Sequence, residues 1–226
     1  MAKNIVFQED LPEPVRREYE QRKNKKRTGT VNTEPSLGGQ ERTPEAKIEL
    51  IASHFEHIMQ ILGLDLNDAS LKDTPMRVAK MYVNELCATL SYQPPKFTMF
   101  PTERKNMVIV KDIQVVSICE HHWMPIIGKV HIGYIPNGQE AGLSKFNRMV
   151  AYLAAKPCMQ ERLTHEIGLF LKTVLTPDVM VVMKAKHHCC ASRGVRDPNS
   201  DTVTSFIEGK FFQYEVRNEF LQLLAL

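Results

Sequence analysis

The stretch SICEHHWMP, Ser117 to Pro125, places one cysteine, one glutamate and two adjacent histidines between two segments rich in β-branched residues. The preceding segment, NMVIVKDIQVVSI, and the following one, GKVHIGYIP, are typical of extended strands. Two strands joined by a short bend predict an antiparallel β-hairpin. The hairpin would then carry metal-binding residue types at its turn.

Cys119 and His122 form a C-x2-H pair within this turn. The spacing lets both side chains close on one tetrahedral ion. A single pair of this kind also arises by chance, but a second cluster, KHHCC, follows at 186–190. Together the two clusters indicate a metal site.

The KHHCC cluster ends a strand-like segment, DVMVVMKAKHHCC. Because strand side chains alternate between faces, one face would carry His187 and Cys189, and the other His188 and Cys190. The spacing alone does not choose between these two pairs.

A site built from Cys119, His122 and one later cysteine would have three protein ligands. Three ligands leave a fourth position open, which is the pattern of catalytic rather than structural zinc. Thiolate and imidazole ligands favour zinc over magnesium or calcium. Zinc can lower the pKa of water towards neutrality, so such a site suits hydrolysis.

The other segments predict further helices and strands. Apolar residues at helical spacing indicate a helix over 46–64, and Thr74 and Pro75 suit the N-cap and first position of a second helix. Ser144 is predicted to cap a third helix, and a fourth starts near Met159. The remaining expectations are a loop at 91–101, strands at 178–190 and 202–212, and a C-terminal helix at 215–224. Two helices followed by strand-strand-helix-helix-strand-strand predict an α+β fold.

The composition suits a water-soluble globular chain: 226 residues, of which 43% are hydrophobic and 24% charged. The N-terminus lacks a signal-peptide core, no apolar run spans a bilayer, and the five cysteines are an odd number. We therefore expect a cytoplasmic protein with reduced thiols and no membrane partner. A net charge of +3 does not by itself indicate a nucleic-acid partner.

Residues 1–45 include a strongly basic segment, RREYEQRKNKKRTGT at 16–30, that is almost without aliphatic side chains. Such a segment has too little apolar surface to offset its ordering entropy, so we expect a flexible arm. A tail that binds nucleic acid or other anions is the alternative interpretation.

Five motifs occur in order: CEHHWMPIIGKVHIGYIP, GLSKFNRMV, QERLTHEI, HHCCASRGV and SDTVTS. Together they resemble the GTP cyclohydrolase I family, from about Ala46 to the C-terminus. The resemblance implies a tunnelling fold, with an N-terminal helical part at 46–100 and a catalytic part at 101–226. It also implies a homodecamer of two pentameric rings with active sites between subunits.

The implied reaction is hydrolysis and rearrangement of GTP to 7,8-dihydroneopterin triphosphate with release of formate. This product leads to folate and one-carbon metabolism, to biopterin or to deazapurines, and these pathways stay open. The resemblance assigns roles to eleven residues. The zinc ligands would be Cys119, His122 and Cys189. His187 would exchange a proton with the purine imidazole, and His121 would serve ring opening at the ribose. Substrate binding would involve Gln160 and Glu161 at the guanine edge and Ser144, Lys145, Arg148 and Arg193 around the ribose and triphosphate.

Two departures from the family pattern concern Lys156-Pro157-Cys158, where Arg-Pro-Gln is common, and Cys190, where a larger apolar residue is usual. Neither replaces a ligand or a proton-transfer residue. The competing hypothesis is a zinc-stapled binding or regulatory protein of the same fold without turnover. It would need a closed site with four ligands.

Overall fold

The predicted hairpin lies inside a five-stranded sheet of order β6-β3-β4-β7-β8. The computed structural model describes residues 3–5 and 42–226. In it β3 (Val108–Cys119) and β4 (Pro125–Tyr134) pair in antiparallel register, as the sequence predicts. β7 (Val179–His187) continues the sheet beside β4, and β8 (Thr202–Ile207) forms its edge. The predicted α+β class is confirmed.

Two short pairings complete the strand arrangement. β6 (Pro157–Cys158) lies parallel to the end of β3, with Cys158 opposite Cys119. A second, three-stranded sheet has the order β1-β2-β5 and consists of β1 (Lys3–Ile5), β2 (Phe97–Pro101) and β5 (Gln139–Ala141). The basic segment 16–30 lies outside the described residues.

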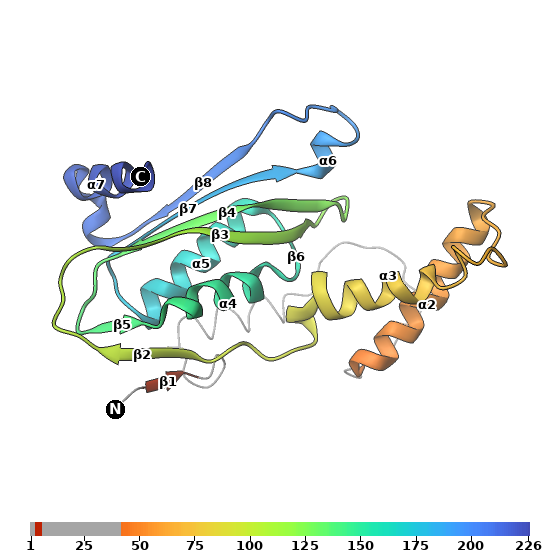
Figure 1. The fold of residues 1–226 in the computed structure, drawn as a ribbon, viewed down its shortest axis with the longest axis horizontal. Coiled ribbons are helices and arrows are strands. Elements are labelled where there is room, and N and C mark those ends of the chain that lie inside the picture. Colours follow the sequence, from red (N-terminus) through yellow and green to blue (C-terminus); the bar gives the residue numbers. More distant parts are fainter. Residues whose placement is uncertain (1–2, 6–41) are drawn as a thin grey trace, which may run out of the picture.

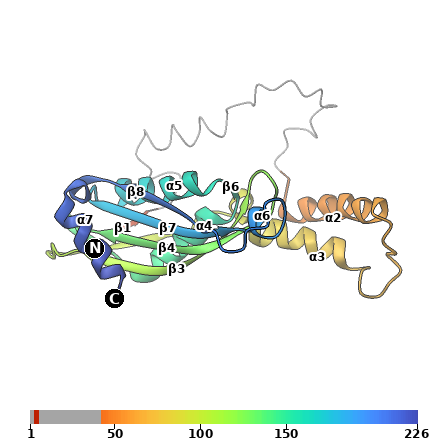
Figure 2. The same cartoon turned by 90° about the horizontal axis from the view of Figure 1, so that it is seen from above.

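Two helices, α4 (Leu143–Ala154) and α5 (Gln160–Val174), cover one face of the large sheet (Figures 1 and 2). The main core lies between them and the strands, because alternate residues of β7 such as Val181 and Met183 point to this side. The opposite face is covered at one end by α7 (Tyr214–Leu224), whose Phe220 is fully buried.

The N-terminal helices form a hairpin that projects beyond the sheet (Figure 1). α2 (Pro44–Ile61) begins at Thr43, whose hydroxyl accepts the N–H of Ala46 at 3.3 Å. α3 (Thr74–Met81) runs into a π-helical turn, η1 (Tyr82–Leu86), and a 3-10 turn, η2 (Ala88–Leu90). Within the described residues, no helix is both long enough and apolar enough to cross a bilayer.

Both predicted N-caps are displaced by a short distance. Asp73, not Thr74, precedes α3, and Gly142, not Ser144, precedes α4. Ser144 already lies inside its helix, because the chain turns helical directly after the extended Gly142. Sequence signals define the existence of a helix better than its first residue.

Three predicted segments also differ in extent. The expected loop at 91–101 contains β2, because this segment pairs with β1 and β5, both distant in sequence. The strand predicted to continue to Cys190 ends at His187 and gives way to a helical turn, α6 (His188–Ala191). β8 ends at Ile207 and is followed by the 3-10 turn η3 (Gly209–Phe212).

Gly168 is required where α5 packs against β8. A Cβ at this position would overlap the ring of Phe206. At an exposed helical site, Gly→Ala stabilises the helix by about 1 kcal/mol. Overpacking a core instead lowers the stability of the folded protein by about 1–3 kcal/mol. We expect Gly168→Ala to lower the unfolding free energy by roughly 1–2 kcal/mol, measured by denaturant titration. Thr173→Ala on the same helix is the control, and an equally or more stable Gly168→Ala protein would contradict the packing argument.

Candidate metal centre and active site

Strand register brings four segments to one end of the large sheet. Ile118 of β3 lies opposite Pro125 of β4, and Ile126 lies opposite His187 at the end of β7. β6 pairs with Cys119 and leads directly into α5. The hairpin turn, α6 and the start of α5 therefore meet at this end.

The turn itself is closed by two backbone hydrogen bonds. The N–H of Cys119 donates to the carbonyl of Met124 at 2.9 Å, and the N–H of Trp123 donates to the carbonyl of Cys119 at 2.9 Å. Trp123 has a left-handed backbone with φ of 55°. This conformation is unfavourable for a bulky side chain, and such residues are often found at functional sites.

The ligand atoms of Cys119, His122 and Cys189 lie within 4.8 Å of one another. In a tetrahedral zinc site with Zn–S of about 2.3 Å and Zn–N of about 2.0 Å, ligand atoms are about 3.3–3.8 Å apart. A small contraction would therefore suffice to hold a metal ion. Two sulfurs and one imidazole also match the ligand preference of zinc.

Cys189 reaches the cluster from α6, not from a strand. The alternation of strand faces was thus the wrong reason for pairing Cys189 with His187, because β7 has already ended. The first turn of α6 directs Cys189 inward and leaves Cys190 exposed, with 3.9 Å between their sulfurs. Of the alternatives that spacing left open, the structure brings Cys189 to Cys119 and His122.

The cluster is electrostatically suited to a cation. Burial, together with the neighbouring Cys119 thiol, raises the pKa of Cys189 to about 11. Two close thiols resist ionising together unless a positive charge compensates them. The arrangement therefore favours metal coordination over a free nucleophilic thiolate.

The two predicted proton-transfer histidines lie beside this cluster in different surroundings. His121 is exposed, and its Nδ1 is 3.7 Å from the sulfur of Cys119. His187 is partly buried, and its Nε2 is 2.8 Å from Oε1 of Gln160. Burial lowers the pKa of His187, and the nearby carboxylate of Glu161 opposes this shift.

The first turn of α5 contributes one buried and one exposed predicted residue. Gln160 is fully buried and Glu161 is exposed. Negative charge at this position interacts favourably with the free N–H groups and dipole of the helix start. Glu161 is therefore placed to present its carboxylate to a ligand.

Sequence reasoning missed an ion pair that ties the turn to α5. Arg162 donates to both carboxylate oxygens of Glu120, at 2.8 and 3.4 Å. It also missed an edge-on contact between Trp123 and Tyr82 of η1, with ring centroids 5.3 Å apart. Both pairs join segments distant in the chain, so no local pattern reveals them.

The predicted phosphate-binding residues of α4 lie away from the cluster. The C-terminal end of α4 leads to β6, which pairs with Cys119, so Ser144 and Lys145 in the first turn lie towards the opposite end, and Arg148 lies in the middle of the helix. A helix of 12 residues is about 18 Å long. Arg193, by contrast, follows α6 directly and stays near the metal end.

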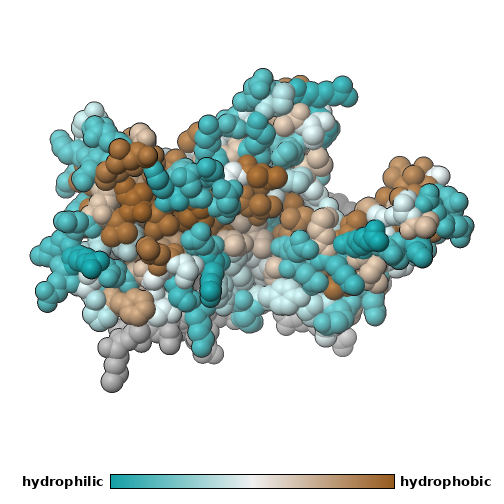
Figure 3. Space-filling view, in the orientation of Figure 1, coloured by the Kyte–Doolittle hydropathy of each residue, from teal (hydrophilic) through white to brown (hydrophobic). Residues whose placement is uncertain are grey.

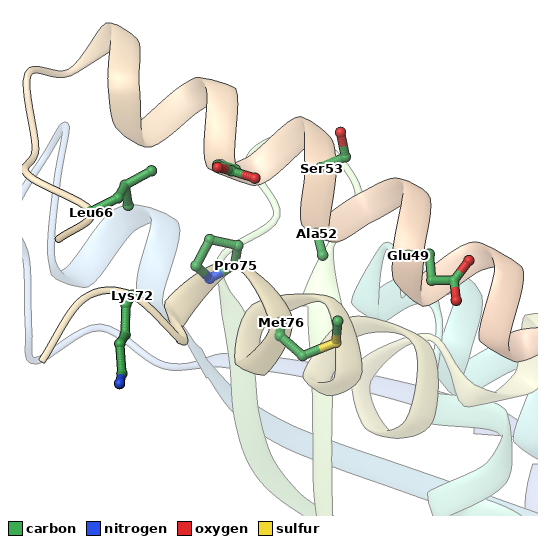
Figure 4. A pocket seen from close by; sticks show the side chains of 8 residues that line it. Glu49, Ala52, Ser53, Leu66, Lys72, Pro75 and Met76 are labelled. Carbon is green, nitrogen blue, oxygen red and sulfur yellow. The ribbon is translucent and has the colours of Figure 1, made fainter. Parts of the chain in front are cut away.

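A shallow pocket of about 400 Å³ lies between α2 and α3 (Figure 4). Its walls include Glu49 and Ser53 from α2 and Lys72, Pro75 and Met76 from the α3 side. It contains none of the predicted site residues, and we assign it no role in the chemistry of the metal end.

The ligand assignment predicts a clear difference between adjacent cysteines. Cys189→Ser should reduce bound zinc from about one ion per chain to nearly none, because it removes one of three protein ligands. Cys190→Ser is the matched control and should retain zinc, since its thiol lies outside the cluster. Elemental analysis of both purified proteins checks this, and zinc loss only in the Cys190 variant would overturn the assignment.

Comparison with known proteins agrees with the motifs. The sequence model of the GTP cyclohydrolase I family matches residues 51–225. A GTP cyclohydrolase 1 of Flavobacterium johnsoniae is 47% identical over 188 residues, covering 81% of this chain and 84% of the relative. Those of Aeromonas salmonicida and Yersinia enterocolitica are 47% and 44% identical, covering 82% and 84% of this chain and 85% and 88% of the relatives. The chain therefore belongs to the GTP cyclohydrolase I family.

Proposed function

We propose that the chain is a zinc-dependent GTP cyclohydrolase I. It converts GTP and water into 7,8-dihydroneopterin triphosphate and formate, the first step of pterin or folate synthesis. The observation that carries this proposal is the cluster of Cys119, His122 and Cys189 beside His187 and the start of α5.

The three ligands would hold zinc at the exposed end of the sheet. When bound, zinc supplies Lewis-acid activation of water for hydration of the purine at C8. The exposed imidazole of His122 leaves this side accessible to a substrate. With only three protein ligands among the described residues, a bound zinc would keep the open fourth position expected of a catalytic site.

The two histidines divide the proton transfers. Burial lowers the pKa of His187 and so favours its neutral imidazole, which can exchange a proton with the purine imidazole ring. His121 is exposed next to the Cys119 turn and acts at the later ribose stage. General acid–base groups of this kind contribute roughly 10²- to 10⁴-fold in rate.

Guanine is read by the start of α5. The guanine edge offers two adjacent N–H donors, and an ionised carboxylate accepts both. Glu161 is the exposed carboxylate in this turn. The sequence predicts a contact of Gln160 with the same edge, but every polar atom of its buried amide has a partner within the protein, so we assign the two guanine donors to Glu161 alone.

We propose that a second subunit completes the triphosphate site. Along α4, Ser144 and Lys145 lie about 14–15 Å from the helix end nearest the metal centre, and Arg148 lies about 9 Å from it. A neighbouring copy would supply these residues, while Arg193 comes from the metal-binding chain. This supports active sites between subunits, and from the family resemblance we propose that the assembly is a tunnelling-fold decamer of two pentamers.

Uncovered apolar surface is consistent with this assembly. Val116 of β3 and Ile127 of β4 are 50% and 44% exposed on the face that α4 and α5 do not cover. Figure 3 shows apolar surface over these strands next to α7, and more at the tip of the helical hairpin. Patches of this kind on a folded chain usually mark interfaces.

We assign residues 46–100 to an N-terminal helical part and 101–226 to the catalytic part of one cytoplasmic enzyme. The expected arm at 1–45 does not lie wholly outside this unit, because Lys3–Ile5 pair with β2 and Pro44 and Glu45 begin α2. The hairpin of α2 and α3 projects beyond the large sheet, which supports a separate N-terminal helical part (Figure 1). The downstream pathway stays open among folate, biopterin and deazapurine synthesis.

The substrate assignment predicts a pterin product and a specific role for Glu161. The purified zinc enzyme should convert GTP, and hardly any ATP, to a product that fluoresces after oxidation. Glu161→Gln should raise KM for GTP roughly 10- to 100-fold, since hydrogen bonds to a charged group are worth about 1.5–3 kcal/mol. Glu215→Gln, in the exposed first turn of α7, is the matched control.

Absence of a fluorescent pterin from the zinc-loaded protein would favour the binding or regulatory alternative. An unchanged KM in the Glu161 variant would mean that guanine is read elsewhere.

The shared site predicts complementation between two inactive variants. Cys189→Ser removes a zinc ligand, and Arg148→Ala removes a residue proposed to bind the triphosphate. Each variant alone should therefore have little activity. Co-assembled in equal amounts, about a quarter of sites between neighbouring subunits would carry neither change. Recovery of up to about a quarter of parental kcat is expected. Mixing Cys119→Ser with Cys189→Ser is the control, and no recovery in the first mixture would place each site within one chain.

A further inference from the structure

Gln160 has an unusual setting for a residue at a substrate site. Its side chain is fully buried, and its Nε2 donates towards three acceptors. These are the carbonyls of Met183 at 3.2 Å and Thr202 at 3.0 Å, and the hydroxyl of Thr204 at 3.1 Å. Its Oε1 lies 2.8 Å from Nε2 of His187. Every polar atom of this amide therefore has a partner inside the protein.

The orientation of the amide follows from its partners. A carbonyl oxygen only accepts hydrogen bonds, so the atom that faces Met183 and Thr202 has to be the NH2 group. Exchanging the oxygen and nitrogen would set a buried oxygen against two carbonyl oxygens. Oε1 is thereby directed at His187, and it can only accept.

The hydroxyl groups of Thr164 and Thr204 extend this hydrogen-bond network away from the site and keep the same donor direction. Thr164 donates to the carbonyl of Gln160 at 3.0 Å, and its Oγ1 is 2.6 Å from that of Thr204. With the Thr164 hydrogen committed, Thr204 donates to Thr164 and accepts from Gln160. The chain of donors from Gln160 through Thr204 to Thr164 is thus consistent at every step, which makes a buried network rigid.

We propose that Gln160 is a positioning residue that fixes the tautomer and orientation of the His187 ring, so that Nδ1 of His187 is the atom that exchanges a proton with the substrate. Because Oε1 of Gln160 only accepts, Nε2 of His187 carries a hydrogen in both the neutral and the protonated ring. Nδ1 makes no hydrogen bond to any described residue. The inference rests on the proposed function for the identity of the substrate, but the tautomer is a property of the protein alone.

The direct test is the tautomer itself. Magic-angle-spinning NMR of the zinc-loaded protein, labelled with 15N-histidine, separates protonated from unprotonated ring nitrogens. The signal of His187 among the eight histidines is identified by its loss in His187→Asn. At a pH where the ring is neutral, we expect a hydrogen on Nε2 and none on Nδ1. A hydrogen on Nδ1 in the parent protein would overturn the proposal, and this measurement needs no substrate.

Gln160→Met tests the role in turnover. It removes the acceptor at similar length, so His187 should populate both tautomers and kcat should fall about 10- to 100-fold, as for outer partners of active-site histidines. KM for GTP should stay within about threefold. Gln160→Glu keeps an acceptor oxygen and should retain more kcat than Gln160→Met.

Thr204→Val is the matched control. It removes one of three acceptors around two N–H groups, and the carbonyls of Met183 and Thr202 remain. The His187 tautomer should therefore stay on Nε2. An unchanged tautomer in Gln160→Met would refute the positioning role, and so would a rise in KM with unchanged kcat, which would indicate direct substrate binding. A parent protein that has the expected tautomer but makes no pterin would refute the proposed function instead.

Discussion

The antiparallel register of β3, β4 and β7 is the constraint on which the site depends. It sets the end of β3 beside the start of β4, and the start of β4 beside the end of β7. Cys119 and α6 are therefore brought to one edge although about 70 residues separate them in the chain. A shift of one residue would reverse the faces of every side chain and separate Cys119 from Cys189.

The short parallel pairing of β6 with β3 extends this arrangement to the helices. β6 follows α4 in the chain and pairs with Cys119, so that α5 begins next to this residue. The first residue of α5 can then enter the core and reach both β7 and β8 through its amide. A buried polar group is tolerated there because all of its donors and acceptors are satisfied.

In the proposed function, the same geometry separates the phosphate-binding residues from the metal centre of their own chain. A helix that ends near the metal edge begins away from it, so the first turn of α4, with Ser144 and Lys145, lies away from this edge. Association with a second copy would bring the metal end of one chain to the phosphate-binding residues of the other. It would also cover apolar strand surface at Val116 and Ile127. In this proposal, assembly and catalysis share one physical cause, which is the length and direction of α4.

Local patterns in the sequence determined much of this protein. Alternating β-branched residues predicted the hairpin, helical periodicity predicted α2, α5 and α7, and the C-x2-H spacing placed two metal-binding side chains in the turn. These signals are local because they depend on neighbouring dihedrals and one-sided burial. The family motifs further identified Cys189, His121 and His187 as candidates.

Only the tertiary structure decided how Cys189 and Gln160 are used. Cys189 joins the cluster through a helical turn that begins where β7 loses its partner strand, and no local pattern marks that point. Gln160 resembles any polar residue at a helix start, yet its surroundings come from Met183, Thr202 and Thr204, far along the chain. Burial and hydrogen-bond partners at these positions depend on long-range register, which a single sequence does not reveal.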